Sequence, residues 1–212
     1  VTGYKWGTAT ITATTTGNDE YCANQTASAN ITIKEFPRIS ISGTTPFCGE
    51  TTELTASIDN ISNDNTKYTI SWYKEGDANV KETGDTFNAS EGVYYAKVTG
   101  DFLETATSDQ LTVTKKSTPT VANFNYEAPD NLEYNNETKT ATVIWNSTQG
   151  GAITIAYSSS NSTVTPVDPI NVGIYYVFVS TVEDEDFCAV NNLYIGTFTI
   201  TCPEVAAPAI DA

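Results

Sequence analysis

Residues 68–76 read YTISWYKEG, and residues 92–98 read GVYYAKV. In the second stretch Tyr94, Ala96 and Val98 share one face of a predicted strand, and the residues between them share the other. The segment TELTASI at 52–58 alternates in the same way, with apolar side chains on one face. A period of two with one apolar face predicts antiparallel sheets packed on one side, so these segments predict an all-β fold.

The stretch GVYYAKV belongs to a pattern that occurs three times along the chain. Each copy begins with a glycine and an alternating strand, turns, and ends with a second alternating strand near a proline or cysteine; the copies run GTATITATTTG to ANITIKEFP from Gly7, GVYYAKVTG to DQLTVTKKSTP from Gly92, and GIYYVFVS to GTFTITCP from Gly173. Repeats of this kind indicate modules in series. We therefore predict a C-terminal hairpin remnant of an upstream module at 1–35, complete modules at 36–116 and 117–202, and a linker at 203–212.

The composition excludes several classes of function. The 212 residues include 10 basic and 26 acidic residues and no histidine, for a net charge of -16. This charge argues against binding to nucleic acid or to an anionic membrane surface, and no apolar run is long enough to cross a bilayer. Without histidine, Ser-His-Asp and Cys-His catalysis are impossible. A carboxylate pair remains open, but the acidic residues fall in predicted turns and on exposed faces, so no enzyme is expected.

The three alternating segments of the middle module resemble an immunoglobulin fold. The resemblance implies strand B at Thr52–Ile58, strand C at Tyr68–Lys74 with Trp72 in the core, and strand F at Gly92–Val98. It also implies that Tyr94 forms a tyrosine corner. Ala56 and Ala96 stand where the intersheet disulfide of this fold normally lies, so the module is expected to rely on its apolar core.

More specific resemblances point to bacterial surface proteins. The wording PRISISGTTPFCGETTELTA, SWYKEG and GVYYAKV is similar to the Ig-like repeats of large surface and secreted proteins from Bacteroidetes-type bacteria, over nearly all of 36–116. Residues 120–201 resemble another bacterial Ig-like repeat, the MBG type, at Pro129, Leu132, Tyr134, 140–143, 151–155, Tyr157, Gly173, Tyr175 and 196–200. The segment 7–33 is similar to the last strands of a bacterial group 2 Ig-like domain. These resemblances imply tandem Ig-like sandwiches in an elongated, extracellular array.

Outward-facing aromatic residues are the candidate ligand-binding residues. Tyr73 and Tyr95 alternate with core residues on neighbouring predicted strands, and Tyr176 and Phe178 are their analogues in the third module. Such rings can stack on sugars or anchor a partner protein. The alternative is that cross-strand aromatic pairs simply stabilise the sheets.

An acidic run marks the last hairpin turn of the third module. Its members, Glu183, Asp184, Glu185 and Asp186, are the candidate calcium ligands, because calcium takes several oxygen ligands from such loops. The run lacks the spacing of an EF-hand, and acidic residues are also common in plain solvated turns. No other cofactor is expected.

The four cysteines are Cys22, Cys48, Cys188 and Cys202, and they form no CxxC pair. Wide spacing in a Thr-rich β protein fits an oxidising, extracellular setting. In Ig modules joined head to tail, the hairpin loop that holds Cys188 points toward the preceding module, and Cys48 lies at the end of the middle module that faces the third. A Cys48–Cys188 bridge is therefore predicted, although four cysteines allow three complete pairings.

The sequence thus favours a non-catalytic segment of a cell-surface adhesin or stalk, built of Ig-like modules and joined to adjacent modules of a longer chain. The alternative is a carbohydrate-binding accessory module of a secreted polysaccharide-utilisation protein. A glycan or a surface protein is the expected partner in either case. A strip of outward aromatic residues on one face would favour the alternative.

Overall fold

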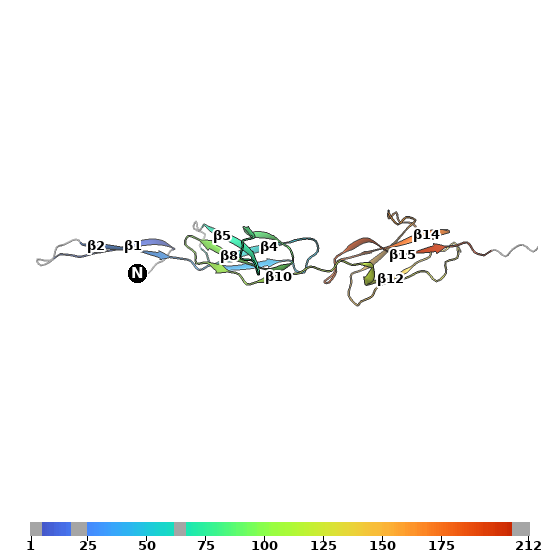
Figure 1. Cartoon of the computed structure of the whole chain (residues 1–212), viewed down its shortest axis with the longest axis horizontal. Helices are drawn as coiled ribbons and strands as arrows, with labels where there is room; N and C mark the ends of the chain where they lie inside the picture. Colours follow the sequence, from blue (N-terminus) through green and yellow to red (C-terminus); the bar gives the residue numbers. More distant parts are fainter. Residues whose placement is uncertain (1–5, 18–24, 62–66, 205–212) are drawn as a thin grey trace, which may run out of the picture. The chain divides into compact units, whose positions relative to one another are not determined.

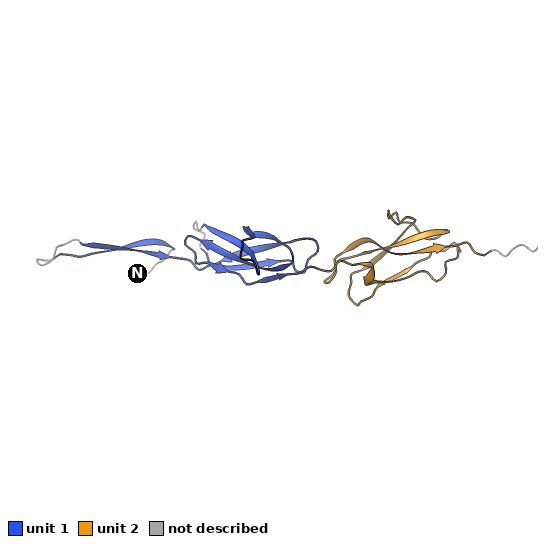
Figure 2. Cartoon of the chain, viewed as in Figure 1, with its two compact units in different colours: residues 1–115 blue, residues 116–212 orange. Residues whose placement is uncertain are grey.

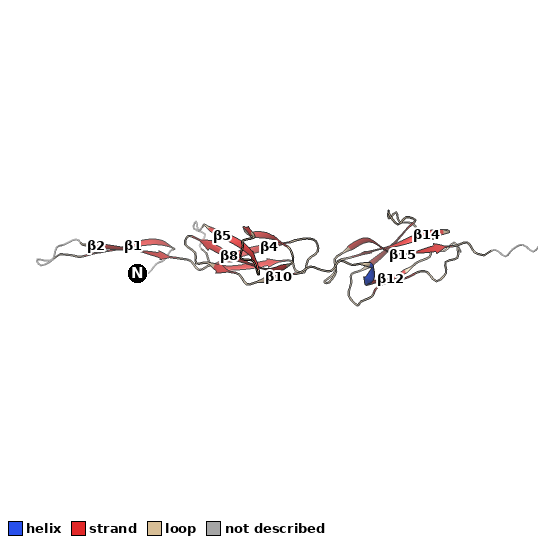
Figure 3. Cartoon of the chain, viewed as in Figure 1, coloured by secondary structure: helices blue, strands red, loops and turns tan. Residues whose placement is uncertain are grey.

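The computed structural model describes residues 6–17, 25–61 and 67–204. Strands make up nearly all of its regular structure, and Figure 3 shows a single short helical turn, η1 (Val121–Asn123), in the described part. The chain divides into two compact units, Val1–Lys115 and Lys116–Ala212 (Figure 2). The prediction of an all-β fold is confirmed.

The first unit begins with a hairpin and continues into a β-sandwich (Figure 1). The hairpin consists of β1 (Gly7–Thr14) and β2 (Thr26–Ile33), which form a separate two-stranded antiparallel sheet. One layer of the sandwich has the order β3 (Arg38–Gly43), β4 (Thr52–Asp59) and β7 (Thr86–Ala89). The other has the order β10 (Leu111–Val113), β8 (Gly92–Gly100), β5 (Tyr68–Lys74) and β6 (Glu82–Thr83), with β9 (Ala106–Thr107) also paired to β8.

This strand order is that of an immunoglobulin fold, and β4, β5 and β8 coincide with the strands expected from the sequence. Trp72 is completely buried at the centre of the sandwich, and its indole N–H donates to the carbonyl of Gly84 at 2.9 Å. Phe87 packs against Trp72 with a ring centroid separation of 5.7 Å. Ala56 and Ala96 are part of the same core, so no disulfide crosses it at those positions.

The second unit is a smaller sandwich. One layer pairs β11 (Phe124–Glu127) with β12 (Thr142–Trp145), and the other has the order β13 (Ile153–Ser158), β14 (Gly173–Thr181) and β15 (Val190–Ile200). Its core takes residues from both layers, including Phe124, Val143 and Val177. The Tyr175 hydroxyl donates to the carbonyl of Asn171 at 2.9 Å, four residues upstream, which is the bond of a tyrosine corner. In the middle module, Tyr94 reaches the Ser90 hydroxyl instead, at 3.3 Å.

The hairpins that begin at Gly7, Gly92 and Gly173 open in the same way. Each glycine has a positive φ, of 134°, 153° and 156° respectively, a region that side chains other than glycine rarely adopt. Each lies opposite a β-branched residue on the partner strand: the pairs are Gly7 with Ile33, Gly92 with Val113, and Gly173 with Ile200. The repeat seen in the sequence is therefore also a repeat of backbone geometry.

Candidate functional site

The chain enters the middle sandwich through a backbone clamp at Glu35. The N–H of Glu35 donates to the carbonyl of Phe102 at 2.8 Å, and the N–H of Glu104 donates to the carbonyl of Glu35 at 2.9 Å. Both partners lie in the turn that follows β8. Glu35, three residues before β3, is thus held parallel to this turn, next to Leu103.

The second unit repeats this clamp at Ser117. The N–H of Ser117 donates to the carbonyl of Asp186 at 3.0 Å, and the N–H of Cys188 donates to the carbonyl of Ser117 at 2.8 Å. These partners lie in the turn between β14 and β15. The two modules differ in sequence here, yet each fixes its entering segment to the same loop by the same pair of bonds.

A short motif accompanies each clamp. The sequence Lys-x-x-Pro occurs at 34–37 and at 116–119, and both prolines are buried. Lys34 forms an ion pair with Glu104 at 3.2 Å, and Lys116 forms one with Glu183 at 2.6 Å. Each lysine therefore contacts the loop that holds the next residue of the chain. At Glu35, Trp6 also packs against Phe102 with a centroid separation of 5.1 Å. The signal was visible in the sequence, where a lysine precedes a proline by three residues at both places.

The chain leaves each sandwich beside an early segment of the same module. In the middle module Phe47 lies parallel to Lys115, and the N–H of Phe47 donates to the carbonyl of Thr114 at 3.0 Å. In the second unit Glu133 lies parallel to Thr201, where the N–H of Tyr134 donates to the carbonyl of Thr201 at 2.9 Å and the N–H of Thr201 donates to the carbonyl of Leu132 at 2.8 Å. Each exit is therefore paired in parallel with an early segment of its own module.

Entrance and exit lie at opposite ends of each sandwich. In the middle module, β8 runs from Gly92, opposite Val113 at the exit, to Gly100, beside the turn that clamps the entrance. In the second unit, β14 runs from Gly173, opposite Ile200 at the exit, to Thr181, beside the loop that clamps Ser117. Each of these strands has nine residues, which corresponds to about 30 Å between the two ends.

Tyr73 and Tyr95 form a stacked pair on the outer face of the β5–β8 sheet. They lie directly opposite each other, with ring centroids 5.2 Å apart and ring planes 9° from parallel. The ammonium group of Lys97 lies over both rings, 4.9 Å from the centroid of Tyr73 and 5.6 Å from that of Tyr95. The two rings therefore contact each other and the lysine, which stabilises the sheet. The same three side chains form a surface that is both aromatic and polar.

A shallow cavity of about 530 Å³ lies beside this pair. Its lining combines one aromatic ring with polar groups: Glu75, Gly76, Tyr95, Lys97, Thr107, Ser108 and Gln110. The amide of Gln110 donates to the carboxylate of Glu75 at 3.3 Å. An aromatic ring bordered by hydroxyl, amide and charged groups can receive a polyhydroxylated ligand.

The analogous aromatic residues of the third module are arranged differently. Tyr176 is half-buried, whereas Phe178 is only 4% exposed and packs against Tyr194 at a centroid distance of 5.8 Å. The register of β14 against β15 shifts between Val177 and Phe178, which places Phe178 opposite Tyr194. Phe178 is therefore not the exposed platform that the alternation predicted, because almost none of its surface is open to solvent. Ligand binding at Tyr176 stays a prediction.

The acidic loop expected to hold calcium performs other tasks in the structure. The carboxylate of Glu183 binds Lys116, and one carboxylate oxygen of Asp184 accepts the N–H groups of Asp186 at 3.0 Å and Phe187 at 2.7 Å. Glu185 and Asp186 are not gathered with them: among residues 6–17, 25–61 and 67–204, no group of three or more His, Cys, Asp or Glu side chains could hold a metal ion. The loop forms a capped turn at the module entrance, and calcium binding there stays a prediction.

The cysteines differ in oxidation state. Cys48 and Cys188 are both disulfide-bonded, whereas Cys202 is an exposed free thiol. Cys22 lies outside the described residues. The Sγ of Cys188 also lies 3.9 Å from the carbonyl of Lys116, so this cysteine belongs to the clamped entrance of its module.

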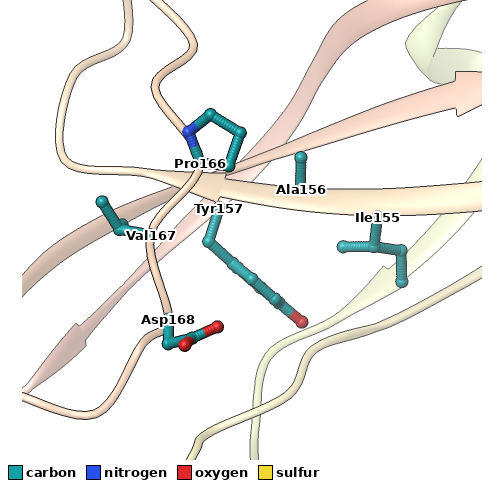
Figure 4. Close-up of a pocket in the computed structure, with 6 residues that line it drawn as sticks. All are labelled: Ile155, Ala156, Tyr157, Pro166, Val167 and Asp168. Atoms are coloured by element: carbon teal, nitrogen blue, oxygen red, sulfur yellow. The ribbon is translucent and has the colours of Figure 1, made fainter.

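A second shallow cavity, of about 310 Å³, lies along β13 (Figure 4). Its lining comes from Ile155, Ala156 and Tyr157 on the strand and from Pro166, Val167 and Asp168 on a loop. Tyr157 extends between Asp168 and Ile155, and its hydroxyl oxygen accepts the N–H of Ala141 at 2.9 Å. Burial raises the pKa of Tyr157. The tyrosine hydroxyl thus bonds the backbone of the facing layer, which is a structural role.

Asp77 has a pKa lowered to about 2, chiefly by a hydrogen bond from Lys81, so it is an ionised turn residue. None of the helices in the described part is long and apolar enough to cross a membrane. The features that repeat in both sandwiches are clamped entrances and paired exits.

The sequence matches no protein-family model and no curated protein. Extracellular domains 3–5 of OTK from Drosophila are 13% identical, and the match covers 77% of this chain and 66% of that one with a TM-score of 0.28. The three N-terminal domains of the highly immunogenic outer capsid protein (Hoc) of bacteriophage RB49 are 14% identical, and the match covers 84% and 73% of the two chains with a TM-score of 0.33. The chain spans just under two thirds of the OTK structure. The fold is defined by the strand order and the register of the sheets.

Proposed function

We propose that the chain is a non-catalytic, load-bearing segment of a cell-surface adhesin or stalk. The observation that carries this proposal is the position of the clamped entrance and the paired exit at opposite ends of both sandwiches. A module of this design passes tension through its full length, and its entering residue cannot swivel freely because two backbone hydrogen bonds hold it.

The pairing at the exits determines how such a module resists force. When the ends are pulled apart, the bond from the N–H of Phe47 to the carbonyl of Thr114 is loaded in shear, so it must fail together with the bonds beside it. Thr45 adds two further bonds there: its hydroxyl donates to the carbonyl of Thr112 at 3.2 Å and accepts the N–H of Thr114 at 3.0 Å. Each such bond contributes about 1 kcal/mol of net stability. Because the bonds break together, the force needed to unfold the module reflects all of them rather than one.

An extracellular location is part of the same proposal. Disulfide-bonded Cys48 and Cys188 fit an oxidising compartment, and a net charge of -16 fits an exposed, soluble surface. The sequence resemblance of residues 36–116 and 120–201 points to surface proteins of Bacteroidetes-type bacteria as the source of such modules. Adjacent modules of a longer chain are the natural partners.

Single-molecule force spectroscopy on the chain, tethered at its two ends under reducing conditions, tests the proposal. We expect two major unfolding steps, each releasing roughly 250 Å of contour length, as about 80 unfolding residues would give. Thr45→Ala should lower the unfolding force of one step. The matched control is Thr52→Ala, which removes a hydroxyl bond of 3.2 Å to Thr44 but none to the exit strand. Equal effects of the two substitutions, or unfolding without resolvable force, would refute a load-bearing role.

The cavity beside Tyr95 supports a second candidate function, binding of a neutral glycan by an accessory module. The ring of Tyr95, the amide of Gln110 and the hydroxyls of Thr107 and Ser108 provide the mixture of stacking and hydrogen bonding that sugars require. A glycan array tests this candidate, with Tyr95→Ala as the variant and Tyr68→Ala, at the exposed start of β5, as the control. Selective binding lost only in Tyr95→Ala would establish a recognition site. Absence of binding would leave the load-bearing role alone.

A further inference from the structure

The β1–β2 hairpin has two chemically distinct faces. On one face the register places Ala9 opposite Ile31, Ile11 opposite Ala29, and Ala13 opposite Ala27. We call these six side chains, together with Ile33, the apolar hairpin face. Its members are exposed or half-buried, and Ile31 is 43% exposed. An isolated two-stranded hairpin is only marginally stable in water. An uncovered apolar face on such a hairpin therefore indicates that another element packs against it.

The other face is already satisfied. Threonine, serine and asparagine side chains bond across the strands: Thr8 with Thr32 at 3.4 Å, Thr10 with Asn30 at 2.8 Å, and Thr12 with Ser28 at 2.9 Å. These polar pairs are suited to solvent. The hairpin thus has one face for water and one for a core, as each strand of a sandwich has.

The equivalent faces of the other two hairpins are buried. Counting from the shared glycine, Ala9, Ile11 and Ala13 correspond to Tyr94, Ala96 and Val98 of β8 and to Tyr175, Val177 and Val179 of β14, all of which are buried. Ile33 corresponds to Val113 and Ile200, each with no exposed surface. In the middle module, the cover is the β3–β4–β7 layer, whose residues share the core with β8.

We propose that the apolar hairpin face is the docking surface for an apolar β-sheet supplied in cis, by sequence that precedes Val1 in a longer polypeptide. In the middle module, the segment before the corresponding glycine, Phe36–Glu91, supplies the covering layer and comprises 56 residues. A covering segment of about the same length is expected upstream of Gly7. It must carry larger side chains than the β3–β4–β7 layer, because Ala9 and Ala13 stand where the other hairpins have Tyr and Val.

The size of the face argues against a second copy of the chain as the occupant. Seven small or medium side chains offer roughly 400 Å² per copy, so two hairpins packed face to face would bury less than the about 1,000 Å² that a specific interface needs. Within the described residues, the two layers of each sandwich already cover each other. A second copy therefore has no uncovered apolar layer to offer except its own hairpin.

Hydrogen exchange tests the proposal by comparing the 212-residue chain with the natural polypeptide extended by about 60 upstream residues. In the extended chain, we expect the amides of β1 and β2 to gain roughly hundredfold or more protection, independent of protein concentration. Ile11→Asp should abolish the gain, while Thr12→Asp on the opposite face should leave it. The exchange of β8 in each sample reports that the middle module remains folded. Unchanged exchange in the extended chain would overturn the proposal, and so would protection of the 212-residue chain that rises with concentration, which would identify a second copy.

Discussion

Ala96 lies directly opposite Trp72 in the β5–β8 pair, and neither side chain has any exposed surface. Ala56, on β4 in the facing layer, belongs to the same core. Immunoglobulin domains commonly place an intersheet disulfide beside such a tryptophan. This module has two small apolar side chains there instead, so its stability depends on the packing of the core rather than on a crosslink.

The pair Ala56→Cys and Ala96→Cys should restore the missing crosslink. We expect the new disulfide to stabilise the middle module by about 2–4 kcal/mol, because it would close a long loop in the unfolded chain. Thermal unfolding with and without reductant measures this effect, and Ala96→Cys alone is the control. If the double variant forms the bond but unfolds at the same temperature as the reduced form, strain at Trp72 outweighs the gain.

Ser117→Pro should destabilise the second unit. Proline removes the N–H that bonds the carbonyl of Asp186, which leaves an acceptor unpaired at the entrance, at a cost of about 1–3 kcal/mol. Ser117→Ala keeps both backbone bonds and should unfold like the unmodified chain. Thermal unfolding followed by calorimetry compares the two variants. Equal melting temperatures would mean that the clamp contributes nothing to stability.

We propose that Cys48 and Cys188 are bonded to each other. Peptide mapping without reductant should recover one crosslinked pair containing these two cysteines, and an alkylating reagent should label Cys202 in the native protein. Recovery of Cys48 linked to Cys22 would refute the pairing. A bridge between these positions would tie the middle module covalently to the entrance loop of the third.

The second unit should lose stability at alkaline pH. Burial raises the pKa of Tyr126 and of Tyr157 above the ordinary tyrosine value of about 10. The folded state therefore holds these protons to higher pH than the unfolded state does. The resulting stability is complete below about pH 10 and is lost as the pH rises through the folded pKa values.

The double substitution Tyr126→Phe and Tyr157→Phe isolates this effect. It should lower the melting temperature at pH 8, because the hydroxyl bonds to Thr197 and Ala141 are lost, yet it should flatten the decline between pH 9 and pH 11. The pH dependence of the melting temperature of the second unit is the measurement. An equally steep decline in the double variant would assign the alkaline loss to other groups.

Much of the fold could be predicted because alternation is visible in the sequence. The strands β4, β5 and β8 were predicted at their observed positions, since a buried face leaves an apolar residue at every second place. Phe178 shows where this inference fails. Alternation placed it outward, but it is only 4% exposed and packs against Tyr194, its partner across the shifted register of β14 and β15. A register shift leaves no mark in the strand's own residues.

The module entrances were missed for a related reason. Their bonds join backbone groups, which every residue possesses, so Glu35 and Ser117 need not resemble each other in sequence. Only the accompanying Lys-x-x-Pro spacing was visible, because the lysine must reach an acidic residue of the loop and the proline must be buried. The acidic run at 183–186 was noticed as charge, but its role in binding Lys116 required the fold.

The entrance clamp has a consequence for how such proteins evolve. Each module holds the backbone of its incoming segment with its own loop, so these backbone bonds are encoded within one module. A gene segment that begins at the lysine of Lys-x-x-Pro would therefore carry its own joint with it. Duplication or shuffling at that boundary would add or exchange domains without redesign of either neighbour, which makes Lys34 and Lys116, rather than the first strands, the natural recombination points.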